Sequence, residues 1–163
     1  MSRICVLSDT HDNLAAAERA LVSIAAMRPA IVIHCGDIVS PAVMELFRGL
    51  PAIFVFGNND DDRAALQRKA RALGFAPLRD ELAFAFSGKE ICVYHGTLRR
   101  RLEALIASQD FDYVLTGHTH RVRNERIGRT RVLNPGALFR ASRYTFAVLD
   151  AAEGGIRMIE VPK

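Results

Sequence analysis

Side chains that commonly bind metal ions follow the ends of several apolar, strand-like segments of this chain. Seven residues occupy such positions: Asp9, His11, Asp37, Asn58, His95, His118 and His120. Asp9 and His11 are two residues apart, as are His118 and His120, so in extended backbone both members of a pair face the same side. Ligands of open α/β sheets bind at the carboxyl ends of strands. We therefore expect the seven side chains to converge on one cleft.

The segments that must position these residues alternate between strand and helix in the first half of the chain. Apolar runs predict strands over residues 3–8, 30–35 and 52–57, and amphipathic runs predict helices over residues 13–27, 41–50 and 61–74. Asp12 or Asn13 is the expected N-cap of the first helix, and Gly74 is expected to end the third. This alternation indicates parallel pairing and an α/β layered fold.

The second half is predicted to be rich in hairpins. We expect one over residues 81–96 with its turn at Ser87-Gly88, one over residues 121–134 with its turn at Ile127-Gly128, and one over residues 145–161 with its turn at Gly154-Gly155. A helix over residues 98–108 and a strand over residues 112–117 are expected between the first and the second hairpin. With 163 residues and no linker or repeat, the chain is expected to form a single domain, residues 1–163.

The order of short motifs resembles a known family. D-x-H at Asp9, G-D at Asp37, G-N-x-D at Asn58, H-G at His95 and G-H-x-H at His118 look like the calcineurin-like metallophosphoesterase superfamily, and most closely its small YfcE-like phosphodiesterases. The motifs span residues 9–120, and residues 134–136, N-P-G, resemble a further motif of the small members. The resemblance implies a four-layer αββα sandwich with a dinuclear metal centre at the carboxyl ends of the strands.

The same resemblance implies a ligand set and an activity. One ion would take Asp9, His11, Asp37 and His120, and the other would take Asp37, Asn58, His95 and His118, with Asp37 shared. The implied enzyme is a phosphodiesterase, a hydrolase that cleaves small or nucleotide-like phosphodiesters with a hydroxide activated by two metal ions. Asp9, Asp37, Asn58, His95 and Asn59 are its candidate catalytic residues.

The chemistry of this ligand set agrees with such an activity. Carboxylates, imidazoles and an amide oxygen suit divalent transition metals. We expect manganese, with Fe, Zn, Ni, Co or Mg as alternatives. Two divalent ions carry four positive charges, of which Asp9, Asp37 and a bridging hydroxide would neutralise three. The neutral Asn58 leaves the remaining charge available to a phosphate.

The G-N-x-D motif departs from the family pattern. Asn59 stands where the fuller motif has a histidine that assists the leaving group, and an amide can donate a hydrogen bond there but not a proton. His34 lies inside a predicted strand and is expected to support the ligands or the core. Asp60 is expected to cap the third helix, with orientation of a neighbouring residue as the alternative. Arg140 and Arg143 are either phosphate contacts or ordinary surface arginines.

Charge and composition leave two other functions open. The net charge of +4 is concentrated in residues 89–163, which hold 13 basic and 8 acidic residues. This basic half allows binding or cleavage of nucleic acid, although no aromatic residues are interleaved with the basic clusters. A protein-binding scaffold of the same fold is the third function, and an oligomer is compatible with any of them.

The chain is expected to be cytoplasmic, with no membrane partner. No apolar run approaches the ~18 residues that span a bilayer, and the N-terminus does not resemble a signal peptide. Cys5, Cys35 and Cys92 lie in apolar runs and form no C-x-x-C pattern. They are expected to be free, buried thiols.

Overall fold

The computed structural model describes residues 2–163, and its first half alternates strand and helix as predicted. The elements of this half are β1 (Arg3–Leu7), α1 (Leu14–Ala26), β2 (Ile31–His34), α2 (Pro41–Glu45), β3 (Ala52–Phe54) and α3 (Arg63–Leu73). The second half comprises β4 (Glu81–Phe86), β5 (Lys89–Tyr94), α4 (Arg99–Ala107), β6 (Tyr113–Leu115), β7 (Val122–Ile127), β8 (Thr130–Pro135), β9 (Tyr144–Asp150) and β10 (Ile156–Val161).

Local signals determine where these helices begin and end. The Asn13 side chain accepts a hydrogen bond from the amide of Ala16 and caps α1, and Gly74 ends α3 in the left-handed conformation at φ 77°. The helix predicted over residues 41–50 is shorter, since α2 ends at Glu45. The backbone then continues in tight turns, with amide-to-carbonyl bonds three residues apart, before the chain enters β3.

The ten strands form two mixed sheets of five strands each. The first has the order β10-β9-β1-β2-β3, in which β1, β2 and β3 are parallel and β9 is antiparallel to β1. The second has the order β4-β5-β6-β8-β7, in which β5, β6 and β8 are parallel. All three predicted hairpins are present, as β4–β5, β7–β8 and β9–β10.

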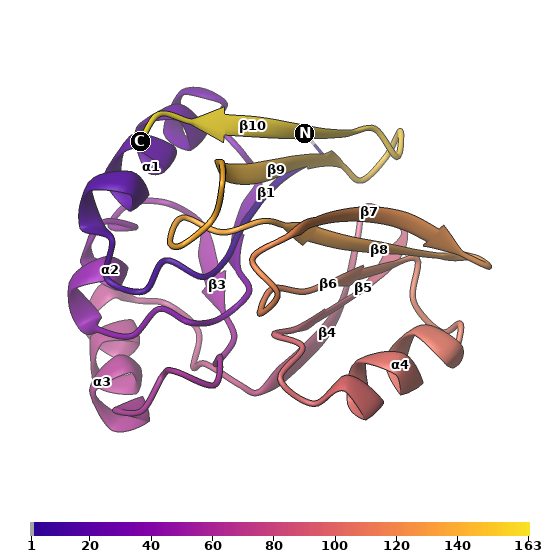
Figure 1. Ribbon diagram of the computed structural model, residues 1–163, viewed down its shortest axis with the longest axis horizontal. Coiled ribbons are helices and arrows are strands. Elements are labelled where there is room, and N and C mark those ends of the chain that lie inside the picture. The colour runs from indigo at the N-terminus through magenta and orange to yellow at the C-terminus, as the bar shows by residue number, and fades with distance from the viewer. Residues whose placement is uncertain (1) are drawn as a thin grey trace.

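The sheets pack face to face between helices and form the predicted four-layer αββα sandwich. Helices α1, α2 and α3 lie beside the first sheet, and α4 lies beside the second (Figure 1). Strand β1 shows how the layers arise from the sequence: Cys5 and Leu7 belong to the core under α1, whereas Ile4 and Val6 belong to the core between the sheets. Burial on both faces explains why this strand is a continuous apolar run.

The loops that follow the parallel strands of both sheets meet at one place. After β1, the amide of Asp9 donates to the carbonyl oxygen of Gly36, which follows β2, at 3.0 Å. The amide of His118, which follows β6 in the other sheet, donates to Asp9 Oδ2, also at 3.0 Å. The predicted ligands of both halves of the chain therefore share one region.

The three cysteines are buried and unpaired, as predicted. Among residues 2–163, no helix combines the length and the apolar character needed to cross a bilayer.

Candidate metal centre

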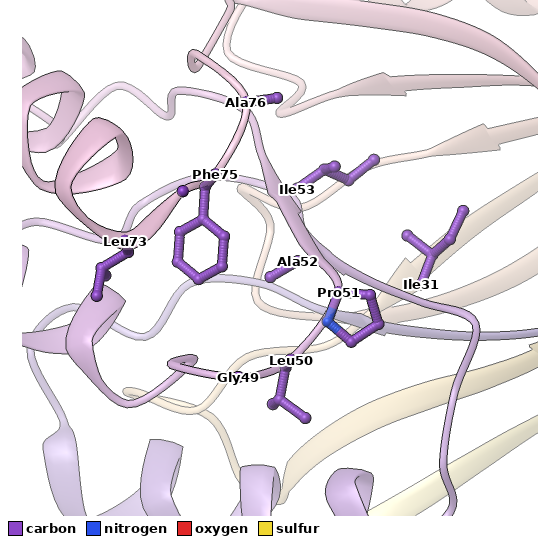
Figure 2. A pocket seen from close by; sticks show the side chains of 10 residues that line it. Ile31, Gly49, Leu50, Pro51, Ala52, Ile53, Leu73, Phe75 and Ala76 are labelled. Carbon is purple, nitrogen blue, oxygen red and sulfur yellow. The ribbon is translucent and has the colours of Figure 1, made fainter.

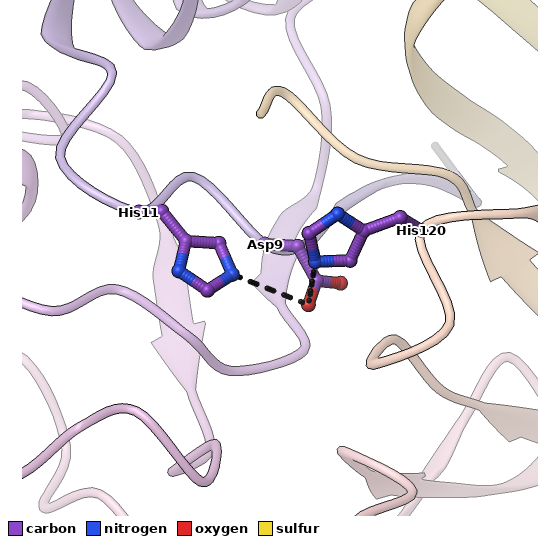
Figure 3. Close-up of side chains that lie close together, drawn as sticks. All are labelled: Asp9, His11 and His120. Carbon is purple, nitrogen blue, oxygen red and sulfur yellow. Dashed lines mark ion pairs between the residues drawn. The ribbon is translucent and has the colours of Figure 1, made fainter. Parts of the chain in front are cut away.

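Asp9, His11 and His120 form one group of potential ligands (Figure 3). His120 Nε2 lies 3.3 Å from Asp9 Oδ1, and His11 Nε2 lies 3.9 Å from the same oxygen. The Asp9 side chain is fully buried, whereas both imidazoles are partly exposed. The group thus has its carboxylate inside and its imidazoles toward solvent.

Asp9, Asp37 and His95 form a second group beside the first. His95 Nε2 lies 3.3 Å from Asp37 Oδ2, and the Asn58 side-chain oxygen lies 3.2 Å from the same nitrogen. Asp37 Oδ2 is also 3.3 Å from His11 Nε2. The Asp37 carboxylate therefore stands between an imidazole of each group, the position that a shared ligand requires.

His118 is brought to the site but not into either group. Its ring lies 5.3 Å from that of His95, measured between centroids, and its backbone amide donates to the Asp9 carboxylate. Its side chain is exposed. The structure thus gathers six of the seven predicted ligands closely and places the seventh at the rim.

The backbone at these ligands is in an unusual conformation. Positive φ angles, which non-glycine residues rarely adopt, occur at five of the candidate ligands: Asp9 (53°), His11 (43°), Asp37 (59°), His118 (69°) and His120 (56°). Such strain persists only where surrounding contacts hold it, and it clusters at functional sites.

Two glycines allow the loops to approach each other. A Cβ atom on Gly57 would lie 2.1 Å from Asp37 Oδ1, and one on Gly117 would lie 2.0 Å from the Ser8 hydroxyl and 2.7 Å from Asp9 Oδ2. Any larger residue at either position would displace a candidate ligand or the hydroxyl beside it.

Asp60 does not cap α3, so that sequence prediction is wrong. Asp62 caps the helix instead, accepting from the amide of Ala65 at 2.8 Å. Asp60 is buried and accepts three backbone hydrogen bonds, from Asp37 (3.1 Å), Val39 (2.7 Å) and Gly57 (2.7 Å). It joins the loops after β2 and β3 and so positions Asp37, which is the alternative role expected from the sequence.

Asn59 lies against Asp37. Its backbone amide donates to Asp37 Oδ1 and its side-chain amide donates to Asp37 Oδ2, both at 2.8 Å. The residue that replaces the histidine of the fuller motif therefore holds a candidate ligand in place.

Residues of the N-P-G motif support the loop of His118 and His120. The Asn134 side-chain amide donates to the Gly117 carbonyl at 2.6 Å and to the Thr119 hydroxyl at 3.2 Å. The sequence indicated the motif but not this contact, because β8 and the loop after β6 become neighbours only in the folded sheet.

His34 is a buried supporting residue, as expected. It packs against Phe54 and Phe47, and its ring nitrogens face the Thr10 hydroxyl (3.2 Å) and the amide of Gly36 (3.2 Å). Burial, with the neighbouring His95, lowers the pKa of His34 to about 3. The imidazole is therefore neutral and accepts from the loop that carries Asp37.

The electrostatics of the site favour a cation between the two carboxylates. The carbonyl oxygen of Cys35 accepts from His95 Nδ1 at 2.6 Å, which leaves Nε2 free to face the carboxylates of Asp9 and Asp37. Burial opposes the charge on Asp37, but the imidazoles of His11 and His95 outweigh it and hold the pKa of Asp37 below its usual range. Burial likewise acts to lower the pKa of His95, yet Asp37 and Asp9 raise it. A proton or a metal ion would satisfy this arrangement.

His11 distinguishes between the two. Its Nε2 is buried and has no hydrogen-bond partner among the described residues, although it lies 3.3 Å from Asp37 Oδ2. A buried polar atom without a partner is costly. Because the atom lies close to the carboxylates of Asp9 and Asp37 without a hydrogen bond to either, the residues fit a bound cation.

A separate hollow of about 630 Å³ does not belong to this site. It lies at the amino ends of β2 and β3, beside the end of α3, and Figure 2 shows Leu50, Pro51 and Phe75 among the side chains that surround it. None of its lining residues is ionisable, so it offers no ligand for a metal ion.

Known proteins share both the sequence pattern and the fold. A model of the calcineurin-like phosphoesterase superfamily domain matches residues 2–154. The phosphodiesterase MJ0936 of Methanocaldococcus jannaschii is 33% identical over 137 residues, which cover 82% of each chain.

Solved structures extend this similarity to almost the whole chain. The structure of an archaeal phosphodiesterase superposes with a TM-score of 0.90 at 30% identity, covering 98% of this chain and 99% of the other. The Escherichia coli phosphoesterase YfcE (TM-score 0.70, 19% identity, 98% and 100% covered) and zinc-bound Vps29 from Entamoeba histolytica (0.69, 20%, 98% and 98%) share the fold.

Proposed function

Because the chain belongs to the calcineurin-like phosphoesterase superfamily, and is therefore a hydrolase of phosphate esters, we propose that it is a metal-dependent phosphodiesterase. Its proposed substrates are small or nucleotide-like phosphodiesters. The name of its 33% identical relative, a phosphodiesterase, supports this choice over a phosphomonoesterase. So does Asn59, because an amide cannot protonate the poor leaving group of an alkyl monoester.

The observation that carries the proposal is the position of Asp37. Its Oδ2 lies 3.3 Å from both His11 Nε2 and His95 Nε2, and the buried nitrogen of His11 has no hydrogen-bond partner among the described residues. We assign two divalent ions to this site. Asp9, His11, Asp37 and His120 are the ligands of one, and Asp37, Asn58, His95 and His118 are the ligands of the other.

Each residue near the ligands has a defined task in this proposal. When bound, two divalent ions activate a water molecule as the nucleophile and neutralise the phosphoryl oxygens. The carbonyl of Cys35 fixes the tautomer of His95, Asn59 holds the carboxylate of Asp37, and Asp60 holds its backbone amide. We expect manganese at this site, with Fe, Zn, Ni, Co or Mg as alternatives, since carboxylate, imidazole and amide ligands are compatible with all of these ions.

Nucleic acid is a less suitable substrate, because part of the predicted basic surface is neutralised. Arg99 pairs with Glu103 and Arg101 pairs with Glu81, each at 2.7 Å. These pairs reduce the positive potential of the arginine cluster at the start of α4.

Alanine substitution of Asn58 tests the proposal. Loss of a ligand should lower kcat/KM for bis(p-nitrophenyl) phosphate by roughly 100-fold or more, since even groups that only support a metal ligand typically contribute 10–100-fold. Asn124→Ala, in the exposed strand β7, is the matched control and should retain activity. Metal binding without hydrolysis in the wild type would instead support a scaffold, the role of the fold that the sequence left open.

A further inference from the structure

A groove of about 380 Å³ opens beside the candidate metal centre. It lies between the start of β7, the loop that joins β8 to β9, and strand β10. Its lining includes His120, Arg121, Val122, Ser142, Arg143 and Glu160, and we call it the arginine groove. Two of its walls therefore carry a guanidinium group.

His120 connects the groove to the site. This residue lines the groove, and its Nε2 lies 3.3 Å from Asp9 Oδ1. Arg121 is the next residue along the chain. A substituent of a phosphate bound at the metal centre can therefore extend into the arginine groove.

The loop that forms one wall is attached to the metal-binding loop. The amide of Leu138 donates to the Asp9 carbonyl at 3.2 Å, and the Asn13 side chain donates to the Leu138 carbonyl at 2.7 Å. Phe139 packs on the ring of His11, with 5.0 Å between centroids. These contacts attach the loop that contains Ser142 and Arg143 to the loop of the candidate ligands.

The arginines of the groove are available to bind an anion. Arg121 makes no ion pair with any residue of the described part of the chain. Arg143 Nη1 lies 3.7 Å from Glu160 Oε2, but both side chains are more than 60% exposed. An exposed pair at that distance contributes little, so Arg143 can exchange Glu160 for a phosphate, which guanidinium groups bind in a two-pronged manner.

We propose that the arginine groove binds a second phosphate, carried on the arm of the substrate that is not the leaving group. The inference rests on the proposed function. It defines the preferred substrates as phosphodiesters that carry a further phosphate, as a nucleotide fragment with a terminal phosphate does. The scissile phosphate occupies the metal centre, so Arg121 and Arg143 bind the second phosphate.

Two substrates with the same leaving group test this inference. They are thymidine 5′-(p-nitrophenyl phosphate) and the same ester with a 3′-phosphate, assayed with the full-length, manganese-loaded protein. We expect the 3′-phosphate to raise kcat/KM about tenfold, the equivalent of ~1.4 kcal/mol. High salt should reduce the ratio of the two values, because exposed charges are screened.

Variants separate the groove from general charge. Arg121→Gln and Arg143→Gln should each lower the ratio, and Glu160→Gln should raise it, because the competing carboxylate is removed. Arg126→Gln is the matched control. Arg126 is an exposed arginine that makes no ion pair with the described residues, and it lies at the other end of β7. An equal kcat/KM for the two substrates in the wild type, or an equal loss in Arg126→Gln, would overturn the inference.

If neither ester is hydrolysed, the proposed function is refuted but the arginine groove is not. A binding measurement then tests the groove. Calorimetry would then compare thymidine 3′,5′-bisphosphate with thymidine 5′-phosphate. Tighter binding of the bisphosphate by the wild type, lost in Arg143→Gln, would support the groove. Equal dissociation constants would refute it.

Discussion

Replacement of Asp60 by asparagine should weaken the site without altering any ligand. The Asp60 carboxylate is 2% exposed and accepts hydrogen bonds from three amides, with Oδ2 serving Asp37 and Gly57 and Oδ1 serving Val39. An asparagine can keep its oxygen at the Oδ2 position. Its NH2 group then faces the amide of Val39, which is itself a donor.

The cost can be worked out from these contacts. One partly buried amide loses its acceptor, and an unsatisfied donor costs roughly 1–3 kcal/mol. We therefore expect Asp60→Asn to lower the free energy of unfolding of the metal-free protein by about 1–2 kcal/mol, the lower half of that range. Asp60→Ala leaves the amides of Asp37, Val39 and Gly57 all without acceptors and should cost about 3–8 kcal/mol. Both variants should also bind Mn²⁺ more weakly, because Asp37 lies on the loosened loop.

Urea denaturation in the presence of a chelator measures the free energy of unfolding, and a Mn²⁺ titration measures the metal affinity. Asp62→Asn is the control, since Asp62 accepts only the amide of Ala65 as a helix cap, a position where asparagine serves as well as aspartate. If Asp60→Asn matches the wild type in both stability and Mn²⁺ affinity, the idea that Asp60 positions Asp37 is wrong.

Asn59 cannot protonate a leaving group, so the wild type should cleave aryl diesters quickly and alkyl phosphomonoesters slowly. Asn59→His should increase the rate most for substrates with poor leaving groups. A rate that does not depend on leaving-group pKa, with chemistry rate-limiting, would contradict this. Burial lowers the pKa of His34 to about 3, below its unfolded value of ~6.5. Between these values only the unfolded state binds the proton, so His34 titration lowers the stability as the pH falls from 6.5 toward 3 and has no such effect above pH 6.5. Urea midpoints of metal-free protein at pH 7 and 5 should therefore differ less in His34→Gln than in the wild type, because glutamine does not titrate. The His34 effect on the free energy of unfolding is at most ~1.4 kcal/mol per pH unit. Burial raises the thiol pKa of Cys5 to about 11 and of Cys92 to about 12, and Cys35 is also buried. A disulfide reagent at pH 8 should therefore label none of the three cysteines in the folded protein and all three after denaturation.

Much of the site was predictable because its residues follow strands. The alternation of apolar and amphipathic runs indicated which segments are strands, and their carboxyl ends contain Asp9, Asp37 and Asn58. The resemblance to the calcineurin-like family, based on the same motifs, is confirmed by the family model. The turn at Ser87-Gly88 and the cap at Asn13 are local features, and both are present.

The supporting contacts were not predictable, because they join distant parts of the chain. The pairing of β1 with β9 and the bond from Asn134 to Gly117 depend on how the two sheets form. Asp60 and Asp62 are both acidic residues before a helix, and only burial distinguishes them. Asp60 lies under the Asp37 loop, so its carboxylate serves that loop, while the exposed Asp62 caps α3.

The central claim is that this site binds two divalent ions and with them hydrolyses phosphodiesters. The most direct test is to remove all metal with a chelator and then titrate the protein with Mn²⁺ while following the hydrolysis of bis(p-nitrophenyl) phosphate. We predict no activity without metal, an increase with added Mn²⁺, and saturation at two equivalents per chain, with Asp37→Ala inactive throughout. Activity that persists in chelator, or no hydrolysis at any Mn²⁺ concentration, would contradict the claim.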